Sequence, residues 1–208
     1  MELLKNGTGE ARATLVLAHG AGAAMDSGFM NAIAEGLAAR GVRVVRFEFP
    51  YMAARRSSAS RKPPDPQPVL LRTWHEVLAE VGAPKQQLAI GGKSMGGRMA
   101  SMIADAAQVA ALVCLGYPFH PPGRPEQLRV EHLRALATPT LIVQGTRDAF
   151  GTQDEVGRYP LSPAIRVHWL AHGDHSFKPP RGSGQSEREN LEECIEAVAA
   201  FLAATIAR

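Results

Sequence analysis

The chain alternates short apolar runs with segments in which apolar residues recur every three or four positions. Six runs rich in β-branched residues predict strands, at residues 13–18, 42–49, 87–90, 110–115, 140–144 and 165–170. Helical spacing predicts five helices, at residues 28–40, 68–81, 95–107, 126–136 and 186–207. Strands that alternate with helices are typical of a mostly parallel sheet, and the continuous apolarity of the strands indicates that helices cover both faces.

Residues 51–68 combine arginine, serine and proline without either period, and we expect an irregular excursion there. It would leave from the carboxyl end of the strand at 42–49, the edge at which open α/β sheets bind ligands. The segment is therefore either a lid over that edge or a plain connector.

The composition limits the class of protein. At 208 residues, with 45% hydrophobic and 21% charged residues, the chain can bury one sizeable core, and we expect a single domain over residues 1–208. No apolar stretch approaches the about 20 residues that span a bilayer, and the first residues lack a secretory pattern, so a soluble cytoplasmic protein is expected. Cys114 and Cys194 stand in apolar surroundings and are expected to be buried thiols, with no disulfide or metal role.

The net charge of +3 is modest, although basic residues gather at Arg55, Arg56, Arg61 and Lys62. No aromatic residues are interleaved with them and no nucleic-acid-binding module is recognisable, which favours a solvated loop that can still attract anionic substrates. We therefore expect no nucleic-acid partner, no membrane partner, no metal and no other cofactor.

The candidate chemistry centres on Gly92-Lys93-Ser94-Met95-Gly96, which follows a predicted strand and opens a predicted helix. A serine on such a sharp turn needs neighbours without bulk, which the glycines supply. The Met95 amide lies in the first helical turn, where an unpaired N–H can stabilise an oxyanion. The motif alone is also compatible with a glycine-rich turn that has no chemistry, so the case depends on partners for Ser94.

A nucleophilic serine at such a turn is followed in the chain by an acid and then by a histidine base. His175, in Gly173-Asp174-His175-Ser176-Phe177 beyond the last predicted strand, is the preferred base. His172 follows the same strand and is the alternative. His168 lies within the strand and is expected to point into the layers that flank the sheet.

Asp148 is the preferred acid, because it ends the turn Gly145-Thr146-Arg147-Asp148 after the strand at 140–144. Asp154 and Asp174 are the alternatives. Asp174 adjoins His175, but consecutive side chains usually point apart.

The second oxyanion donor is expected from the loop after the first strand, His19-Gly20-Ala21-Gly22-Ala23-Ala24. Its small residues let the backbone approach a substrate, and the Ala21 amide is preferred over that of Gly20. His19 is expected to anchor this loop by hydrogen bonding. Such a loop also suggests dinucleotide binding, but Met25 stands where G-x-G-x-x-G requires glycine, which makes this the weaker interpretation.

With these segments in place, the chain resembles the α/β-hydrolase superfamily over nearly its whole length. It is similar to small lidless or short-lidded bacterial members related to dienelactone hydrolases and to a further group of hydrolase-like domains. The resemblance implies a three-layer α/β/α sandwich with a mostly parallel sheet of six or seven strands, and a triad of Ser94, Asp148 and His175. One departure is the short amino-terminal region, where residues 1–12 leave room for at most one strand.

These features predict a serine hydrolase that cleaves a small-to-medium carboxylic ester or thioester through an acyl-enzyme intermediate. Gly20, Tyr117, Phe119, Phe150 and Phe177 are expected to line the substrate pocket. Lys93 would favour acidic substrates if its ammonium stayed near the site, although a lysine more commonly points into solvent.

Two other functions use the same residues. A non-catalytic α/β-hydrolase scaffold would bind a protein or a small ligand and keep the serine turn for folding. An acyltransferase would pass the acyl group to an alcohol instead of water. A small-molecule substrate is the expected partner, and a homodimer is left open.

Overall fold

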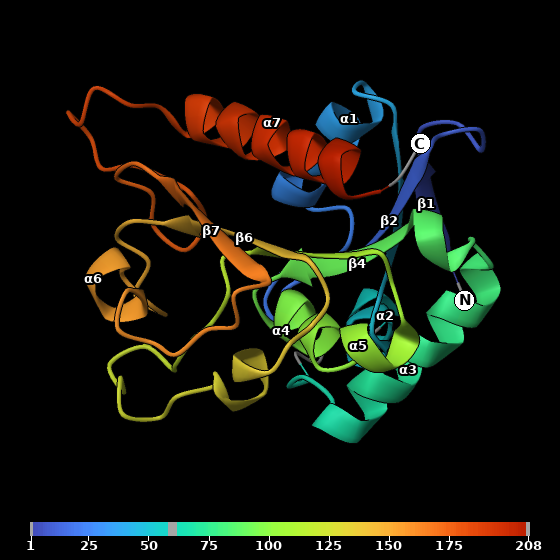
Figure 1. Cartoon of the computed structure of the whole chain (residues 1–208), viewed down its shortest axis with the longest axis horizontal. Coiled ribbons are helices and arrows are strands. Elements are labelled where there is room, and N and C mark those ends of the chain that lie inside the picture. Colours follow the sequence, from blue (N-terminus) through green and yellow to red (C-terminus); the bar gives the residue numbers. More distant parts are fainter. Residues whose placement is uncertain (1, 58–61, 207–208) are drawn as a thin grey trace.

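The computed structural model describes residues 2–57 and 62–206. A seven-stranded sheet of order β1-β3-β2-β4-β5-β6-β7 runs through its centre (Figure 1). The strands are β1 (Leu3–Asn6), β2 (Ala13–Ala18), β3 (Val42–Phe47), β4 (Leu88–Lys93), β5 (Ala111–Leu115), β6 (Thr140–Gly145) and β7 (Ile165–Leu170). β1 pairs antiparallel with β3 and the other neighbours pair in parallel. The predicted mostly parallel sheet is confirmed, with seven strands.

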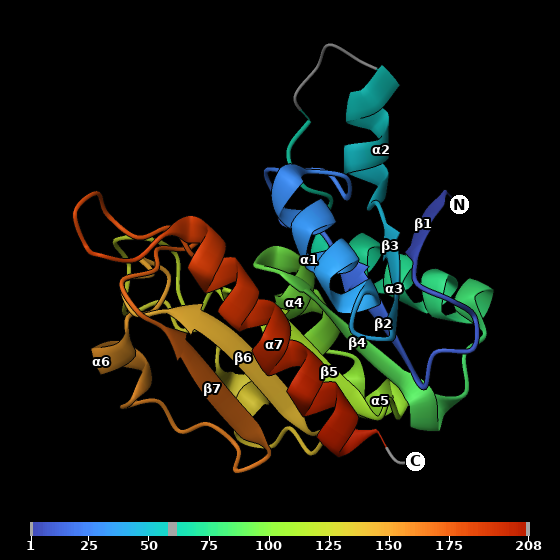
Figure 2. The same ribbon diagram turned by 90° about the horizontal axis from the view of Figure 1, so that it is seen from above.

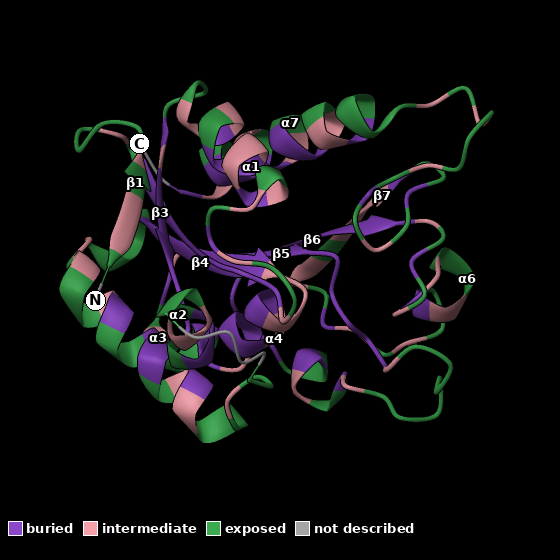
Figure 3. Cartoon of the chain, turned by 180° about the vertical axis from the view of Figure 1, so that it is seen from behind, coloured by how far each residue is buried: buried purple, intermediate pink, exposed green. Residues whose placement is uncertain are grey.

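Helices cover both faces of this sheet, as the continuous apolarity of the strands predicts. α1 (Gly28–Ala38) and α7 (Glu187–Thr205) pack on one face, and α3 (Gln67–Val81), α4 (Met95–Ser101) and α5 (Ala104–Ala107) on the other (Figure 1). Every residue of β2 is buried, and the central strands form the buried middle layer in Figure 3. The fold is thus the expected three-layer sandwich.

α7 shows how local sequence sets an element. Ser186 accepts a hydrogen bond from the Glu189 amide while the Glu189 carboxylate accepts one from the Ser186 amide, which starts the helix. Cys194, Val198 and Leu202 then bury one stripe against the sheet and α1. The predicted last residue of this helix, 207, lies outside the described residues.

The segment 51–68 is more ordered than predicted, because α2 (Pro50–Ser57) occupies its start. Pro50 suits the first helical turn, and the Asp65 carboxylate accepts a hydrogen bond from the Tyr51 amide at 2.8 Å. Because this cap comes from a residue 14 positions further along the chain, no local pattern in the sequence indicates where α2 begins. Figure 2 shows α2 projecting beyond the carboxyl end of β3. Arg61 of the predicted basic cluster lies outside the described residues.

Two predicted helices differ in the structure. The helix at 95–107 is divided into α4 and α5 by a turn at 102–103. The prediction of a helix at 126–136 is wrong, since only the 3₁₀ turn η2 (Glu131–Arg134) forms there. The Arg129 amide, which a helix would have used, donates instead to the Phe119 carbonyl at 2.7 Å. The short elements η1 (Lys85–Gln87) and α6 (Gln153–Val156) complete the chain.

Within the described ranges, no helix combines the length and apolarity that a membrane crossing requires. Cys114 and Cys194 are free and buried, in agreement with their predicted surroundings. Burial raises the pKa of both thiols, so they stay protonated and unreactive.

Candidate active site

Ser94 occupies the sharp turn between β4 and α4. Its backbone has φ 50° and ψ −115°, a conformation that residues other than glycine rarely adopt. Such strained residues cluster at functional sites. The two glycines of the motif are needed for close packing. A Cβ on Gly92 would lie 2.6 Å from the Ala18 carbonyl oxygen, and one on Gly96 would lie 2.6 Å from that of His19. The sequence motif therefore reflects a steric requirement.

Ser94, His175 and Asp148 form one hydrogen-bonded chain across the carboxyl edge of the sheet. Nδ1 of His175 lies 2.8 Å from Oδ2 of Asp148, and Nε2 lies 2.8 Å from Oγ of Ser94. A carboxylate only accepts hydrogen bonds, so Nδ1 carries the proton and Nε2 is free to accept the serine hydroxyl. This order of groups gives a serine, a base and an orienting acid within direct reach.

Asp148 is fully buried and held in place by its neighbours. The Phe150 amide donates to Oδ1 at 2.9 Å, and the Gln144 side chain donates to Oδ2 at 2.9 Å. These bonds satisfy the buried carboxylate and fix the oxygen that His175 meets. Sequence reasoning missed Gln144, although a polar residue ending an apolar strand was a usable signal.

The loop after β2 is oriented by His19. The Phe49 amide donates to Nε2 of His19 at 3.1 Å, so Nδ1 must carry the proton that it donates to the Gly20 carbonyl at 2.7 Å. Because the trans peptide is planar, this bond also fixes the direction of the Ala21 N–H, which points opposite to that carbonyl. Burial lowers the pKa of His19, which favours the neutral ring that both bonds require. The predicted anchoring of the loop agrees with these bonds.

α2 supports the same loop from outside. The Tyr51 hydroxyl donates to the Ala21 carbonyl at 3.2 Å, and Arg55 reaches the same oxygen at 3.4 Å. Burial raises the pKa of Tyr51 to about 12, so its hydroxyl remains a donor. No local pattern indicated this contact, since α2 itself was not predicted.

The Met95 amide lies on the other side of Ser94. The Arg98 amide makes the first intrahelical bond, to the Ser94 carbonyl at 3.0 Å, so the Met95 amide precedes the bonded part of α4. It is therefore available to an anion in front of the helix. The shared oxyanion role of Met95 and Ala21 remains a prediction.

A pocket of about 320 Å³ opens in front of Ser94 and His175. Gly20 and Phe150 line it as predicted, and Phe150 packs on the His175 ring with centroids 4.1 Å apart. Its other walls come from Ala21, Gly22, Ala23, Ser27, Phe29, Met30, Lys93 and Ser176.

Three aromatic residues predicted to line the pocket do not. Tyr117, Phe119 and Phe177 are fully buried, and the structure places them in the core. Tyr117 packs on Phe119 with centroids 4.8 Å apart, and its hydroxyl donates to the Arg129 carbonyl. Proximity in sequence to the strand ends does not determine the direction of a side chain, and burial of these large rings stabilises the core instead.

The alternative acids and bases are exposed or bonded to other groups. His172 is exposed, and His168 reaches Glu193 of α7 at 2.9 Å, as its predicted direction implies. The Asp174 carboxylate accepts from the amides of Ser176 and Lys178, and Asp154 is exposed in α6. Among the residues that the structure describes, no group of three or more His, Cys, Asp or Glu side chains could hold a metal ion.

The expectation that the Lys93 side chain points into solvent is wrong. Its amino group donates to the His175 carbonyl at 2.6 Å, and Lys93 itself lines the pocket. Burial lowers the pKa of Lys93 to about 8, while Asp148 and Asp174 oppose the shift. The lysine is therefore part of the site.

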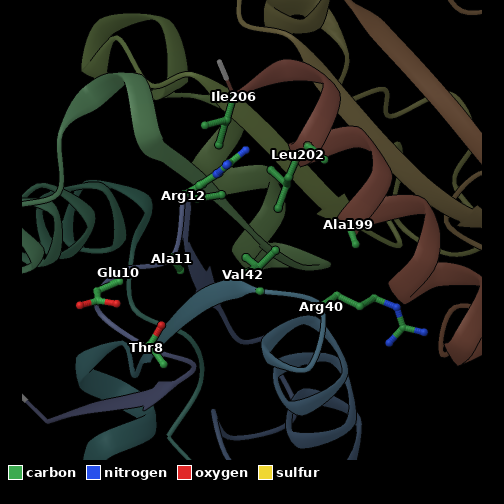
Figure 4. A pocket seen from close by; sticks show the side chains of 12 residues that line it. Thr8, Glu10, Ala11, Arg12, Arg40, Val42, Ala199, Leu202 and Ile206 are labelled. Carbon is green, nitrogen blue, oxygen red and sulfur yellow. The ribbon is translucent and has the colours of Figure 1, made fainter. Parts of the chain in front are cut away.

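A second cavity, of about 490 Å³, lies at the opposite edge of the sheet, between the amino ends of β2 and β3 and the end of α7. Figure 4 shows its wall, which includes Arg12, Arg40, Leu202 and Ile206. Arg40 is already engaged, because it pairs with Glu192 and donates to the Gly36 carbonyl. The cavity contains no serine or histidine that could serve as nucleophile or base.

A serine turn, a histidine and a buried acid at the carboxyl edge of a mostly parallel sheet define the hydrolase-like class of α/β proteins. The family described as “Alpha/beta hydrolase domain” matches residues 11–203, and the chain belongs to this family. Comparison with the sequences of curated proteins finds no match.

Solved structures show the same fold. A lid-less α/β serine hydrolase from Xanthomonas campestris has a TM-score of 0.73 at 17% identity, covering 99% of this chain and 89% of that one. A monoacylglycerol lipase from Paleococcus ferrophilus has a TM-score of 0.74 at 15% identity, covering 98% of both chains. Est1E from Butyrivibrio proteoclasticus, with ferulic acid bound, has a TM-score of 0.73 at 16% identity, covering 100% and 96%. These likenesses show the α/β-hydrolase fold, which this chain shares with a serine hydrolase that has no lid.

Proposed function

We propose that this chain is a serine hydrolase that cleaves a small-to-medium carboxylic ester or thioester through an acyl-enzyme intermediate. The observation that carries the proposal is the continuous chain of hydrogen bonds from Ser94 through His175 to the buried Asp148. A turn serine kept only for folding has no need of a base at 2.8 Å or of a buried acid behind that base.

The first half of the reaction forms the acyl-enzyme. Oγ of Ser94 attacks the carbonyl carbon while Nε2 of His175 takes the hydroxyl proton, and Asp148 stabilises the resulting imidazolium. The amides of Met95 and Ala21 bind the oxyanion of the tetrahedral intermediate. His175 then gives the proton to the leaving alcohol or thiol as the bond to the acyl carbon breaks.

The second half releases the acid. Water gives a proton to His175 and attacks the acyl carbon, and the Ser94 oxygen leaves with the proton returned by His175. The pocket volume supports a small acyl group, since about 320 Å³ is near the lower end of the range for ligand sites. Two proteins of similar structure, a monoacylglycerol lipase and a serine hydrolase, support esters as the class of substrate.

A series of p-nitrophenyl esters from acetate to palmitate tests this function, with Ser94→Ala as the control. We expect hydrolysis of acetate and butyrate by the wild type and none above background by the variant. Activity confined to long chains would contradict the proposed substrate size, and inactivity of the folded wild type throughout the series would favour a binding scaffold. Added alcohol with product analysis separates hydrolysis from acyl transfer, because a hydrolase in water still releases mainly the free acid, whereas a transferase forms mainly the new ester.

A further inference from the structure

The side chain of Lys93 runs beneath the candidate active site and meets several of its loops. Its Cγ lies 3.4 Å from the position that a Cβ on Gly20 would take, so the stem packs under the loop after β2. Its amino group reaches the loop after β7, where it donates to the His175 carbonyl. Lys93 thus contacts the loops that carry the proposed oxyanion donor and the proposed base.

The amino group is enclosed on several sides. A Cβ on Gly116 would lie only 2.8 Å from Nζ and 3.1 Å from the His175 carbonyl oxygen, so the glycine leaves the space that the amino group fills. The rings of Phe29 and Phe177 lie 5.7 Å and 5.8 Å from Nζ. These contacts hold the amino group at one position. The amino group of a surface lysine without such contacts moves freely.

The loop that carries His175 needs such support. It has no regular structure after β7, and His172 and Phe177 both have positive φ. Asn190 of α7 holds the loop on either side of the histidine, by donating to the carbonyls of Ala171 and Phe177. Lys93 is bonded to the carbonyl of His175 itself, and the next residue in its own strand-to-helix turn is Ser94.

We propose that Lys93 is a positioning residue that holds His175 in hydrogen-bonding distance of Ser94, an inference that rests on the proposed hydrolase function. The bond from Nζ to the His175 carbonyl links the backbone of the base to the turn of the nucleophile, so that the two side chains keep their separation. A displacement of about 1 Å between reacting groups costs on the order of 100-fold in rate. Lys93 acts through His175 and takes no part in proton transfer.

The test compares Lys93→Met, which keeps the length of the side chain and removes the donor, with the wild type. Turnover of p-nitrophenyl acetate and the rate of fluorophosphonate labelling are measured together, after circular dichroism has shown that the variant is folded. We expect kcat and the labelling rate to fall at least about 10-fold, with KM within about twofold. Lys93→Gln keeps a donor on a shorter stem and is expected to recover part of the rate.

Lys178→Met is the matched control, because Lys178 lies in the same loop with an exposed side chain, 3.8 Å from Glu187. Its rate should equal that of the wild type. If the wild type is labelled and Lys93→Met is labelled equally fast, the positioning role is overturned while the proposed function stands. If the folded wild type is not labelled, the proposed function itself fails.

Two further results would also overturn the positioning role. A change confined to KM, larger for an anionic ester than for p-nitrophenyl acetate, would make Lys93 a substrate contact. Loss of folding in both Lys93→Met and Lys93→Gln would assign the residue to the stability of the core.

Discussion

The two edges of the sheet carry cavities that differ in chemistry more than in size. The cavity at the amino edge is the larger, at about 490 Å³ against about 320 Å³, but its arginines are near the surface and Arg40 is paired with Glu192. At the carboxyl edge, a serine, a histidine and a fully buried aspartate converge from three different loops. The convergence of polar groups, and not the cavity volume, identifies the candidate site.

The largest expected effect comes from removing the nucleophile at the carboxyl edge. Ser94→Ala should lower ester turnover by about 10⁴-fold or more, because no other group can form the acyl-enzyme. The melting temperature should change little, since the Ser94 side chain makes no capping bond to α4. Ser57→Ala, at an exposed position in α2, is the control. Equal turnover by Ser94→Ala and the wild type would remove the distinction between the two edges.

Filling the space between the serine turn and the loop after β2 should have the next largest effect. A methyl group in Gly96→Ala meets the carbonyls of Ala18 and His19, which are backbone atoms that cannot rotate away. We expect a loss of stability of about 1–3 kcal/mol and about a 100-fold lower turnover, measured by urea unfolding and ester hydrolysis.

Gly9→Ala, beside the amino-edge cavity, is the matched substitution. No atom of residues 2–57 and 62–206 lies within 4 Å of its Cβ position, so neither stability nor turnover should change appreciably. A larger loss in Gly9→Ala than in Gly96→Ala would contradict the steric account of the serine turn.

The lowered pKa of Lys93 predicts how stability depends on pH. The pKa of Lys93 is lowered to about 8 in the folded state, against about 10.4 for a free lysine. Between these values the unfolded chain binds more protons, so the free energy of unfolding should rise with pH, by up to about 3 kcal/mol for this group. The free energy of unfolding is measured in urea at pH 7 and pH 10.5 for the wild type and for Lys93→Met, and the difference between the two proteins isolates the contribution of the amino group. Parallel curves for the two proteins would show that the amino group is solvated.

Substitutions at the amino edge should have the smallest effect. Arg12→Ala and Arg40→Ala are expected to leave turnover within about twofold and to cost less than about 1 kcal/mol of stability, because both residues are exposed and a surface ion pair such as that of Arg40 with Glu192 contributes little. Hydrolysis rates and thermal unfolding measure both quantities. A large loss of turnover in either variant would mean that the two edges are functionally coupled.

Much of the fold could be predicted because burial leaves a local pattern. β2 is apolar at nearly every position since helices cover it on both sides, and α7 repeats its apolar residues with the helical period. The failures depend on distant partners. Asp65 caps α2, and the Phe119 carbonyl binds the amide that a helix at 126–136 would have used.

The candidate site divides in the same way. Ser94, Asp148 and His175 each follow a recognisable strand, and parallel strands bring their carboxyl ends to one edge, so these residues could be predicted to lie together. Lys93 could not be placed from sequence, because the groups that enclose it, Gly116 and the His175 carbonyl, lie in the loops that follow β5 and β7. Composition alone assigns a lysine to the surface.

The most direct test of the central claim is fluorophosphonate labelling of the wild type beside Ser94→Ala and His175→Ala, with the modified peptide identified by mass spectrometry. Activation of Ser94 by His175 predicts that the wild type is labelled at Ser94, that Ser94→Ala is not labelled, and that His175→Ala is labelled far more slowly or not at all. A folded wild type that remains unlabelled, or one labelled at the same rate without His175, would contradict it.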